Sequence, residues 1–174
     1  LSWRDALTGL PNRSLFLKRL EQKLASARQD SKYASMLLID LDGFMAINEA
    51  HGMTAGDTLL KMVSEHFVHA LEAGAVLARL SSDEFAVLLP QLVSGTEAAG
   101  RLALTVAEKL RAVLRESLQV DGEAIHLDAS IGIAVFPQTP QETGSDALRE
   151  ADMAMHRAKS DGGGRDVFFE SAMG

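Results

Sequence analysis

The order of short apolar runs and longer amphipathic segments is the feature that most constrains the fold of this chain. Strand-length runs and segments of helical periodicity alternate as strand 35–40, helix 55–71, strands 75–80 and 85–89, helix 96–118 and strand 125–136. The resulting βαββαβ order is that of the split βαβ or ferredoxin-like arrangement. We therefore predict an α/β protein of the α+β kind, with a mixed, largely antiparallel central sheet flanked by helices.

Further elements are expected on either side of this core. A turn-rich entry segment at 1–13 precedes a helix that ends near residue 27, and a second flanking helix is predicted at 145–160. Residues 167–169 have the composition of an edge strand. The stretch 41–56 contains three glycines and is expected to be irregular or weakly helical. The methionines, including Met45 and Met53, are expected to pack in the interior.

Composition excludes several classes of protein. The 174 residues, 47% of them hydrophobic, suit one domain spanning 1–174, with its core at about 14–170. No apolar run approaches the roughly 18 residues of a membrane span, and a net charge of −7 without a basic stripe argues against nucleic acid as a partner. We expect a cytoplasmic domain without membrane contact. Because the chain begins at Leu1, it is expected to be part of a longer protein, whose membrane anchoring stays open.

The predicted topology brings separated carboxylates together. A right-handed crossover makes strands 35–40 and 75–80 parallel, with the strand that starts at residue 85 between them. Asp40 and Asp42, at the end of the first strand, therefore lie at the same sheet edge as Asp83 and Glu84 in the 81–84 turn. Such oxygen ligands suit Mg²⁺ together with substrate phosphates. Simple solvation of acidic strand ends is the alternative, and the residues alone leave both interpretations open.

The chain also resembles a known family. The segments DALTGLPNR, LIDLDGF, INEAHGMTAGD, RLSSDEFAVLLP, SIGIAVFP and EADMAMHRAK occur in the order and spacing of GGDEF domains, the diguanylate cyclase domains of bacterial cyclic di-GMP signalling. The resemblance implies a palm-like, nucleotidyl-cyclase-like fold. It also implies that two GTP molecules condense into cyclic di-GMP and pyrophosphate between two facing domains, so that a homodimer is required. The TGLPNRSLF opening is similar to domains that precede an EAL phosphodiesterase domain, which implies such a partner in the full-length chain.

Roles for individual residues follow from the resemblance. It implies that Asp40 and Asp83 hold Mg²⁺ or Mn²⁺, that the Leu41 carbonyl assists, and that Glu84 takes part in metal or base chemistry. Asn48 and Asp57 would hydrogen-bond the guanine edge, which offers donors that a carboxylate accepts. Lys159 would reach the phosphates, and the turn residues Ser81 and Ser82 would lie against the substrate.

Four departures from the family pattern stand out. Ser81 and Ser82 replace the two glycines of the signature turn, Met45 replaces a lysine, and Gly163 replaces an arginine. The inhibitory product site, an Arg-x-x-Asp motif, would fall at 72–75, where the sequence is Glu-Ala-Gly-Ala; that site is predicted to be absent. A left-handed serine costs roughly 1–2 kcal/mol, so the hairpin is expected to form. Serine side chains would nevertheless crowd the place of a phosphate.

Three hypotheses follow for the function. The first is a degenerate GGDEF domain, catalytically weak or silent, that binds GTP and acts as a regulatory module. The second is an active diguanylate cyclase that tolerates the serines, because Asp40, Asn48, Asp57, Asp83, Glu84 and Lys159 are all present. The third is an interaction domain that binds no nucleotide.

Overall fold

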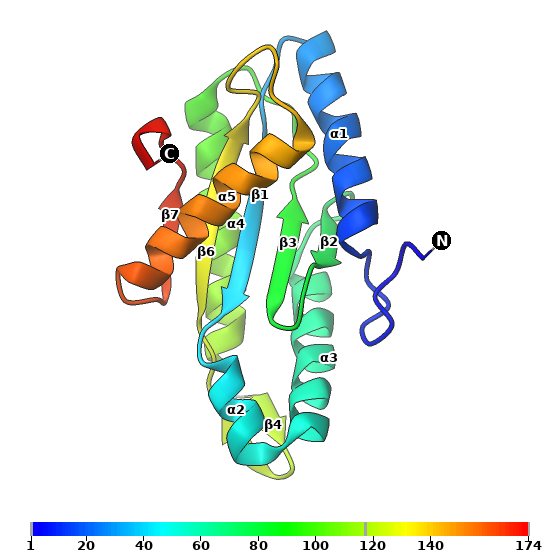
Figure 1. The fold of residues 1–174 in the computed structure, drawn as a ribbon, viewed down its shortest axis with the longest axis vertical. Coiled ribbons are helices and arrows are strands. Elements are labelled where there is room, and N and C mark those ends of the chain that lie inside the picture. Colours follow the sequence, from blue (N-terminus) through cyan, green and yellow to red (C-terminus); the bar gives the residue numbers. More distant parts are fainter. Residues whose placement is uncertain (1, 117, 174) are drawn as a thin grey trace.

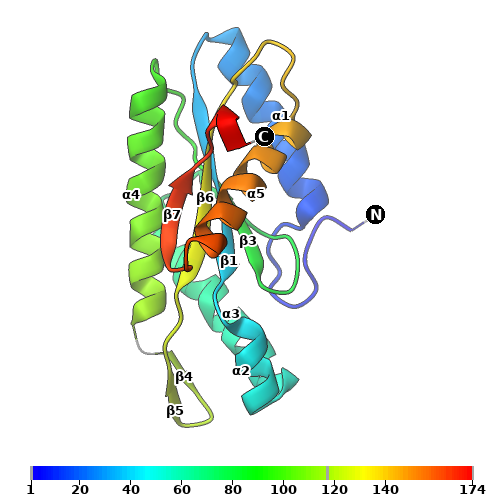
Figure 2. The same ribbon diagram turned by 60° about the vertical axis from the view of Figure 1, so that its left-hand side comes forward.

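A five-stranded sheet with helices on both faces forms the body of the molecule (Figures 1 and 2). The structure is a computed structural model that describes residues 2–116 and 118–173. Its sheet has the order β2-β3-β1-β6-β7, and the strands span Val76–Arg79 (β2), Glu84–Leu88 (β3), Ala34–Leu41 (β1), Ala129–Phe136 (β6) and Arg165–Phe168 (β7). The helices span Arg13–Gln29 (α1), Phe44–His51 (α2), Met53–Ala70 (α3), Thr96–Arg115 (α4) and Gly144–Ser160 (α5), and Ser171–Met173 form a short 3-10 helix.

The central strand explains why the chain folds around it. All eight residues of β1 are buried, as expected for a continuous apolar run covered on both faces. β1 pairs antiparallel with β3 on one side and with β6 on the other. Because β2 is also antiparallel to β3, β1 and β2 run parallel, as the crossover rule predicted. β7 adds a parallel edge strand beside β6.

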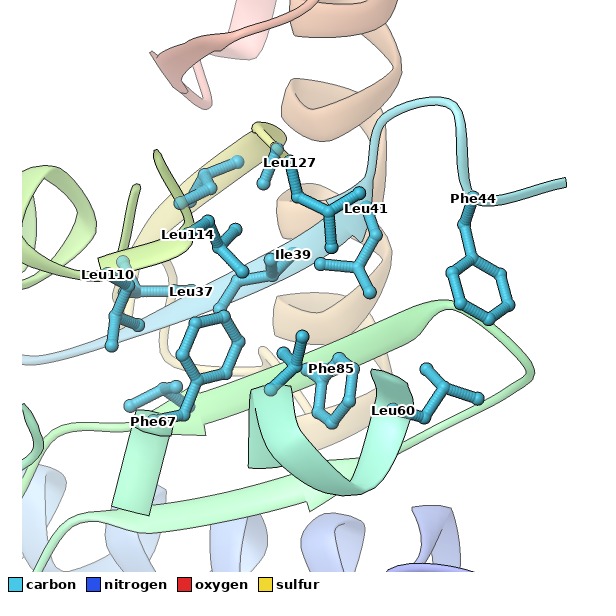
Figure 3. Close-up of a cluster of buried hydrophobic side chains, with 14 of the residues drawn as sticks. Leu37, Ile39, Leu41, Phe44, Leu60, Phe67, Phe85, Leu110, Leu114 and Leu127 are labelled. Carbon is cyan, nitrogen blue, oxygen red and sulfur yellow. The ribbon is translucent and has the colours of Figure 1, made fainter. Parts of the chain in front are cut away.

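Alternation along β1 divides the core between two faces. Leu37, Ile39 and Leu41 point into a cluster with residues of α3 and α4, including Phe67 and Leu114 (Figure 3). The residues between them, Met36 and Leu38, face α1 and α5 together with Phe16, Leu20, Leu148 and Met155. Asp40 continues this second set, so its carboxylate is directed to the face that carries α1 and α5.

The structure differs from the sequence prediction in two segments. Residues 44–51 form a regular helix, α2, which starts after Gly43 at a φ of 74°. The predicted strand 125–136 is divided into β5 (Glu123–Ile125) and β6, and β5 pairs with β4 (Leu118–Val120) in a separate hairpin. Asp121 and Gly122, with φ of 53° and 80°, form the turn of this hairpin. Asp-Gly is a strong hairpin signal that the prediction overlooked.

Two further expectations, on the burial of the methionines and on membrane-spanning helices, can be compared with the structure. The prediction that the methionines pack inside is wrong for Met45, in the first turn of α2, and for Met53, at the start of α3, which are 71% and 75% exposed. Within 2–116 and 118–173, none of the helices combines the length and the apolar character needed to cross a bilayer.

Candidate functional site

The predicted carboxylates converge at one edge of the sheet. Asp40 stands directly opposite Glu84 in the β1–β3 ladder, and the Leu41 N–H donates to the Asp83 carbonyl at 3.0 Å. Asp83 and Glu84 both act electrostatically on Asp40. The topological argument from the sequence is therefore confirmed in its geometry: carboxylates more than 40 positions apart in the chain form one site.

Asp40 is the most perturbed carboxylate of this site. Its side chain is 7% exposed, and its Oδ2 lies 2.8 Å from Lys159 Nζ of α5. Burial raises the pKa of Asp40 to about 6; Lys159 opposes this rise, and Asp83 and Glu84 add to it. Oδ1 is buried without a hydrogen-bond partner among the described residues. An orphaned carboxylate oxygen next to two other acids has spare capacity for a cation.

Lys159 is placed for two partners. Burial lowers its pKa, but the hydrogen bond and charge of Asp40, with Asp83 and Asp42 behind it, raise the pKa overall. The Lys159 side chain remains 41% exposed. It therefore stays charged and can leave Asp40 for another anion, such as a phosphate, without crossing the protein interior.

The serine turn is closed by its own hydroxyls. Ser81 Oγ donates to Glu84 Oε1 at 3.0 Å, and Ser82 Oγ donates to Asp83 Oδ1 at 3.2 Å. Neither serine has a positive φ, so the turn forms without left-handed serine, and the expectation that the hairpin survives is confirmed. The hydroxyls occupy acceptor sites on the two acids that the resemblance assigns to metal and base chemistry.

The turn is also connected to the entry segment. Arg79 Nη1 donates to the Asp5 carboxylate at 3.1 Å, while Nη2 donates to the Ser82 carbonyl at 3.0 Å. Burial raises the pKa of Asp5, but hydrogen bonds from Thr8 and Arg79 outweigh it and the pKa is lowered overall. Asp5 therefore holds the arginine that supports the turn.

The predicted guanine-binding residues lie at the junction of α2 and α3. Asn48 is half-buried on α2, and its Oδ1 has no partner among the described residues. A Cβ at Gly56 would lie 1.6 Å from this oxygen, so the amide packs directly on the backbone beside Asp57. Asp57 is exposed on α3. The structure thus brings the two residues together and leaves both with hydrogen-bonding capacity for a planar ligand edge.

Asp42 is a residue whose role the sequence did not reveal. Its Oδ1 accepts from Ser130 Oγ, and its Oδ2 accepts from the Gly164 N–H, both at 2.8 Å. A Cβ on Gly163, whose φ is 74°, would lie 3.1 Å from the same carboxylate. The left-handed backbone at Gly163 therefore favours glycine, and a side chain at this position would be strained. The three successive glycines after a helix were the available signal.

The donor set fits a hard divalent cation held partly by its substrate. Within the described ranges, no three His, Asp or Glu side chains converge closely enough to hold a metal by themselves. Mg²⁺ is usually held by one or two carboxylates and completed by waters and substrate phosphates. Asp40, with its orphaned oxygen, and Asp83 meet that requirement. A neighbouring cavity of about 250 Å³ between α1 and α5 reaches Glu84 and is bordered by Arg13 and Arg149, but Asp40 and Asp83 do not line it.

Two other departures are visible in the structure. Met45 lies exposed in the first turn of α2, where a long cationic side chain would meet no steric obstacle. Residues Glu72 to Ala75 form the turn between α3 and β2, closed by a hydrogen bond from the Ala75 N–H to the Glu72 carbonyl at 3.3 Å. Neither an arginine nor an aspartate is present in this turn.

Comparison with known proteins identifies the family. Residues 2–165 match the family model described as "Diguanylate cyclase, GGDEF domain". The chain therefore belongs to the GGDEF domain family of cyclic di-GMP signalling. Its mixed α+β fold, with a mostly antiparallel sheet, agrees with the palm-like fold that the resemblance implied.

Individual relatives define the degree of similarity. The chain is 40% identical over 173 residues to the bifunctional diguanylate cyclase/cyclic di-GMP phosphodiesterase MucR of Pseudomonas aeruginosa, covering 99% of this chain and 24% of MucR. It is 33% identical over 165 residues to the cyclic di-GMP phosphodiesterase NbdA of the same organism, covering 95% and 20%. The structure of the GGDEF domain of TpbB, also from P. aeruginosa, superimposes with a TM-score of 0.88 at 36% identity, covering 98% and 96%. The chain spans only a quarter or less of MucR and NbdA.

Proposed function

We propose that this chain binds GTP with a divalent cation and turns it over weakly or not at all, so that it acts as a nucleotide-responsive regulatory module. The observation that carries the proposal is the serine turn. The hydroxyls of Ser81 and Ser82 engage Glu84 and Asp83, while the Asp40–Lys159 pair and the Asn48–Asp57 junction remain available to a nucleotide.

Each part of the site has a defined task in this proposal. Asn48 and Asp57 hold the guanine edge through hydrogen bonds, and Lys159 moves from Asp40 to a phosphate. Asp40 and Asp83, with the Leu41 carbonyl and Glu84 beside them, hold Mg²⁺ or Mn²⁺, which when bound activates an attacking oxygen and neutralises phosphoryl charge. In a competent site Glu84 or Asp83 would accept the proton of the attacking hydroxyl. Here each carboxylate already accepts a hydrogen bond from a serine. The Cβ atoms of Ser81 and Ser82 also occupy space beside the turn that the triphosphate would need.

The size of the expected defect supports weak turnover. Removing one preorganised donor to a developing charge costs roughly 2.7–4 kcal/mol in known cases, or about 10²–10³ in rate. Met45 removes one such cation from α2. Crowding in the turn adds to this loss, so that GTP affinity is retained far better than turnover.

An active diguanylate cyclase is the second candidate, and a specific observation favours it. The serines adopt no positive φ and the Asp40–Lys159 pair is assembled, so the hairpin keeps its acids in place. In that case catalysis would require a second GGDEF domain facing the first. The names of MucR and NbdA, which include cyclic di-GMP phosphodiesterase activity, support a proposal that an EAL domain accompanies this chain.

A single experiment separates these functions. Purified protein is incubated with GTP and Mg²⁺, and cyclic di-GMP is measured by mass spectrometry; calorimetry with a non-hydrolysable GTP analogue measures binding. We expect binding without appreciable multiple turnover. Sustained production of cyclic di-GMP would establish the active cyclase instead. Absence of binding at millimolar analogue would leave an interaction domain that uses no nucleotide.

A further inference from the structure

One cross-strand row connects the acids of the site to a cation on the edge strand. Glu84 of β3 pairs with Asp40 of β1, Asp40 pairs with Ser130 of β6, and Ser130 pairs with Arg165 of β7. Directly paired residues in a sheet present their side chains on the same face. Adjacent strands are about 4.8 Å apart, so Arg165 begins about 10 Å from Asp40, within reach of a shared ligand.

The alternation along β7 confirms the direction of Arg165. Asp166 binds Arg111 of α4 at 3.2 Å, and Phe168 contacts Gly100 of α4. These two residues therefore face α4, and Arg165, in the alternate position, faces the side of the sheet that carries α5 and Lys159.

The turn that precedes Arg165 is hydrogen-bonded to the site. Asp42 accepts the Gly164 N–H, and Arg111 donates to the Gly164 carbonyl. The Arg165 Nε donates to the Gly163 carbonyl at 3.1 Å, so the guanidinium lies over the glycine turn. In the described part of the chain Arg165 forms no ion pair with a carboxylate. An exposed guanidinium on the same side of the sheet as Lys159 is suited to a phosphate group.

We infer that Arg165 is a phosphate-binding residue of this site, and that it supplies the positive charge which position 163 cannot carry. The inference rests on the proposed function, since it requires that the site binds a nucleoside triphosphate. Its ligand is the phosphate chain rather than the base, because Asn48 and Asp57 supply the groups proposed for the guanine edge. An arginine at position 163 would instead meet the Asp42 carboxylate in a left-handed backbone.

The test compares nucleotides that differ only in phosphates. Calorimetry measures the affinity of wild type and Arg165→Gln for a non-hydrolysable GTP analogue and for GMP, both with Mg²⁺. We expect Arg165→Gln to weaken the triphosphate by about 10- to 100-fold, as for loss of a charged hydrogen bond, and GMP by less than about twofold. Arg101→Gln, on the exposed surface of α4, is the matched control and should change neither.

Each other outcome has a defined meaning. Equal weakening of both nucleotides, or no change with either, would overturn the assignment of Arg165 while leaving nucleotide binding intact. If wild type bound neither nucleotide, the proposed function itself would fail. The variant Gly163→Arg gives a second check that does not depend on Arg165: it should lower the thermal midpoint and fail to tighten the triphosphate. Tighter binding by Gly163→Arg would show that position 163 is the phosphate position.

Discussion

At the scale of single residues, the site shows that a substitution can keep a structure and change its chemistry. Ser81 and Ser82 form the turn without strained backbone, so nothing in the fold demands glycine there. Their hydroxyls, however, bind the carboxylates that would act on a ligand. The effect of the serines is therefore expected on ligand affinity and turnover rather than on stability.

Two double variants separate crowding from hydroxyl bonding. Ser81→Gly with Ser82→Gly removes both the Cβ atoms and the hydroxyls, whereas Ser81→Ala with Ser82→Ala removes only the hydroxyls. We expect the glycine pair to tighten a GTP analogue by about tenfold, equivalent to about 1.4 kcal/mol, and the alanine pair to gain much less. Calorimetry provides the measurement. Equal gains in both variants would show that the hydroxyl bonds, and not the occupied volume, limit binding.

The ionised Asp40 side chain is expected to lower the free energy of unfolding of the protein at neutral pH. Its raised pKa means that the buried carboxylate is disfavoured in the folded state near neutral pH. Asp40→Asn should therefore raise the free energy of unfolding at pH 7.5, without metal, by about 1 kcal/mol. The gain should shrink as the pH falls through about 6, where wild-type Asp40 takes up its proton. Urea unfolding of both proteins at pH 7.5 and at a pH below about 6 checks this prediction. A lower stability of Asp40→Asn than of wild type at pH 7.5 would contradict it.

At the scale of elements, most of the architecture was predictable and the irregular connections were not. Apolar periodicity located β1, β3, α3 and α4 because burial on one or both faces leaves a direct trace in the sequence. Pairing of β1 with β3 then followed from crossover handedness, and with it the meeting of Asp40 and Glu84. α2 was predicted only as irregular or weakly helical structure, because its short apolar face lies between two glycines and contacts such as that of Asn48 with Gly56 depend on the folded structure.

The role of Asp42 could not be predicted for a related reason. Its partners, Ser130 and Gly164, are 88 and 122 positions away, and no periodicity in the sequence signals such bonds. The same holds for the cross-strand row that ends at Arg165. Residue types at strand ends suggested a site, but its boundaries depend on register, which only the assembled sheet defines.

The link between β1 and the turn after α5 can be tested directly. Asp42→Ala removes two hydrogen bonds, each contributing about 1 kcal/mol. We expect faster hydrogen exchange at the Gly164 amide and a lower thermal midpoint. Asp161→Ala is the control, because this aspartate is exposed in the same turn and its side chain makes no hydrogen bond in the described part of the chain. Unchanged exchange at Gly164 in Asp42→Ala would show that Asp42 does not hold the turn.

At the scale of the whole molecule, a second acidic pair lies away from the site. Glu142 is 4% exposed before α5, and its Oε2 accepts the Gln138 N–H at 2.6 Å. Glu150, on α5, is half-buried; burial and the neighbouring Glu142 raise its pKa to about 8, with smaller contributions from Arg149, which lowers it, and Asp146, which raises it. The folded protein therefore retains a proton on this pair at neutral pH.

This pair predicts how global stability depends on pH. Between about 4.5 and 8 the folded chain binds a proton that the unfolded chain releases, so the free energy of unfolding should fall as the pH rises through this window. Glu150→Gln should flatten that dependence and be more stable than wild type at pH 8.5. Urea titrations from pH 5 to 9 provide the measurement. Glu97→Gln, fully exposed on α4, is the control, and a dependence as steep in Glu150→Gln as in wild type would contradict the prediction.

The bonds from Asp5 through Arg79 to Ser82 have a mechanical consequence. They join the entry segment to the peptide backbone of the serine turn by a chain of only two contacts. A displacement of Asp5 would therefore reach the turn beside Asp83 and Glu84 through the side chain of Arg79, the last residue of β2. Asp83 and Glu84 lie next to one end of this chain of contacts, and a single arginine, Arg79, connects its two ends.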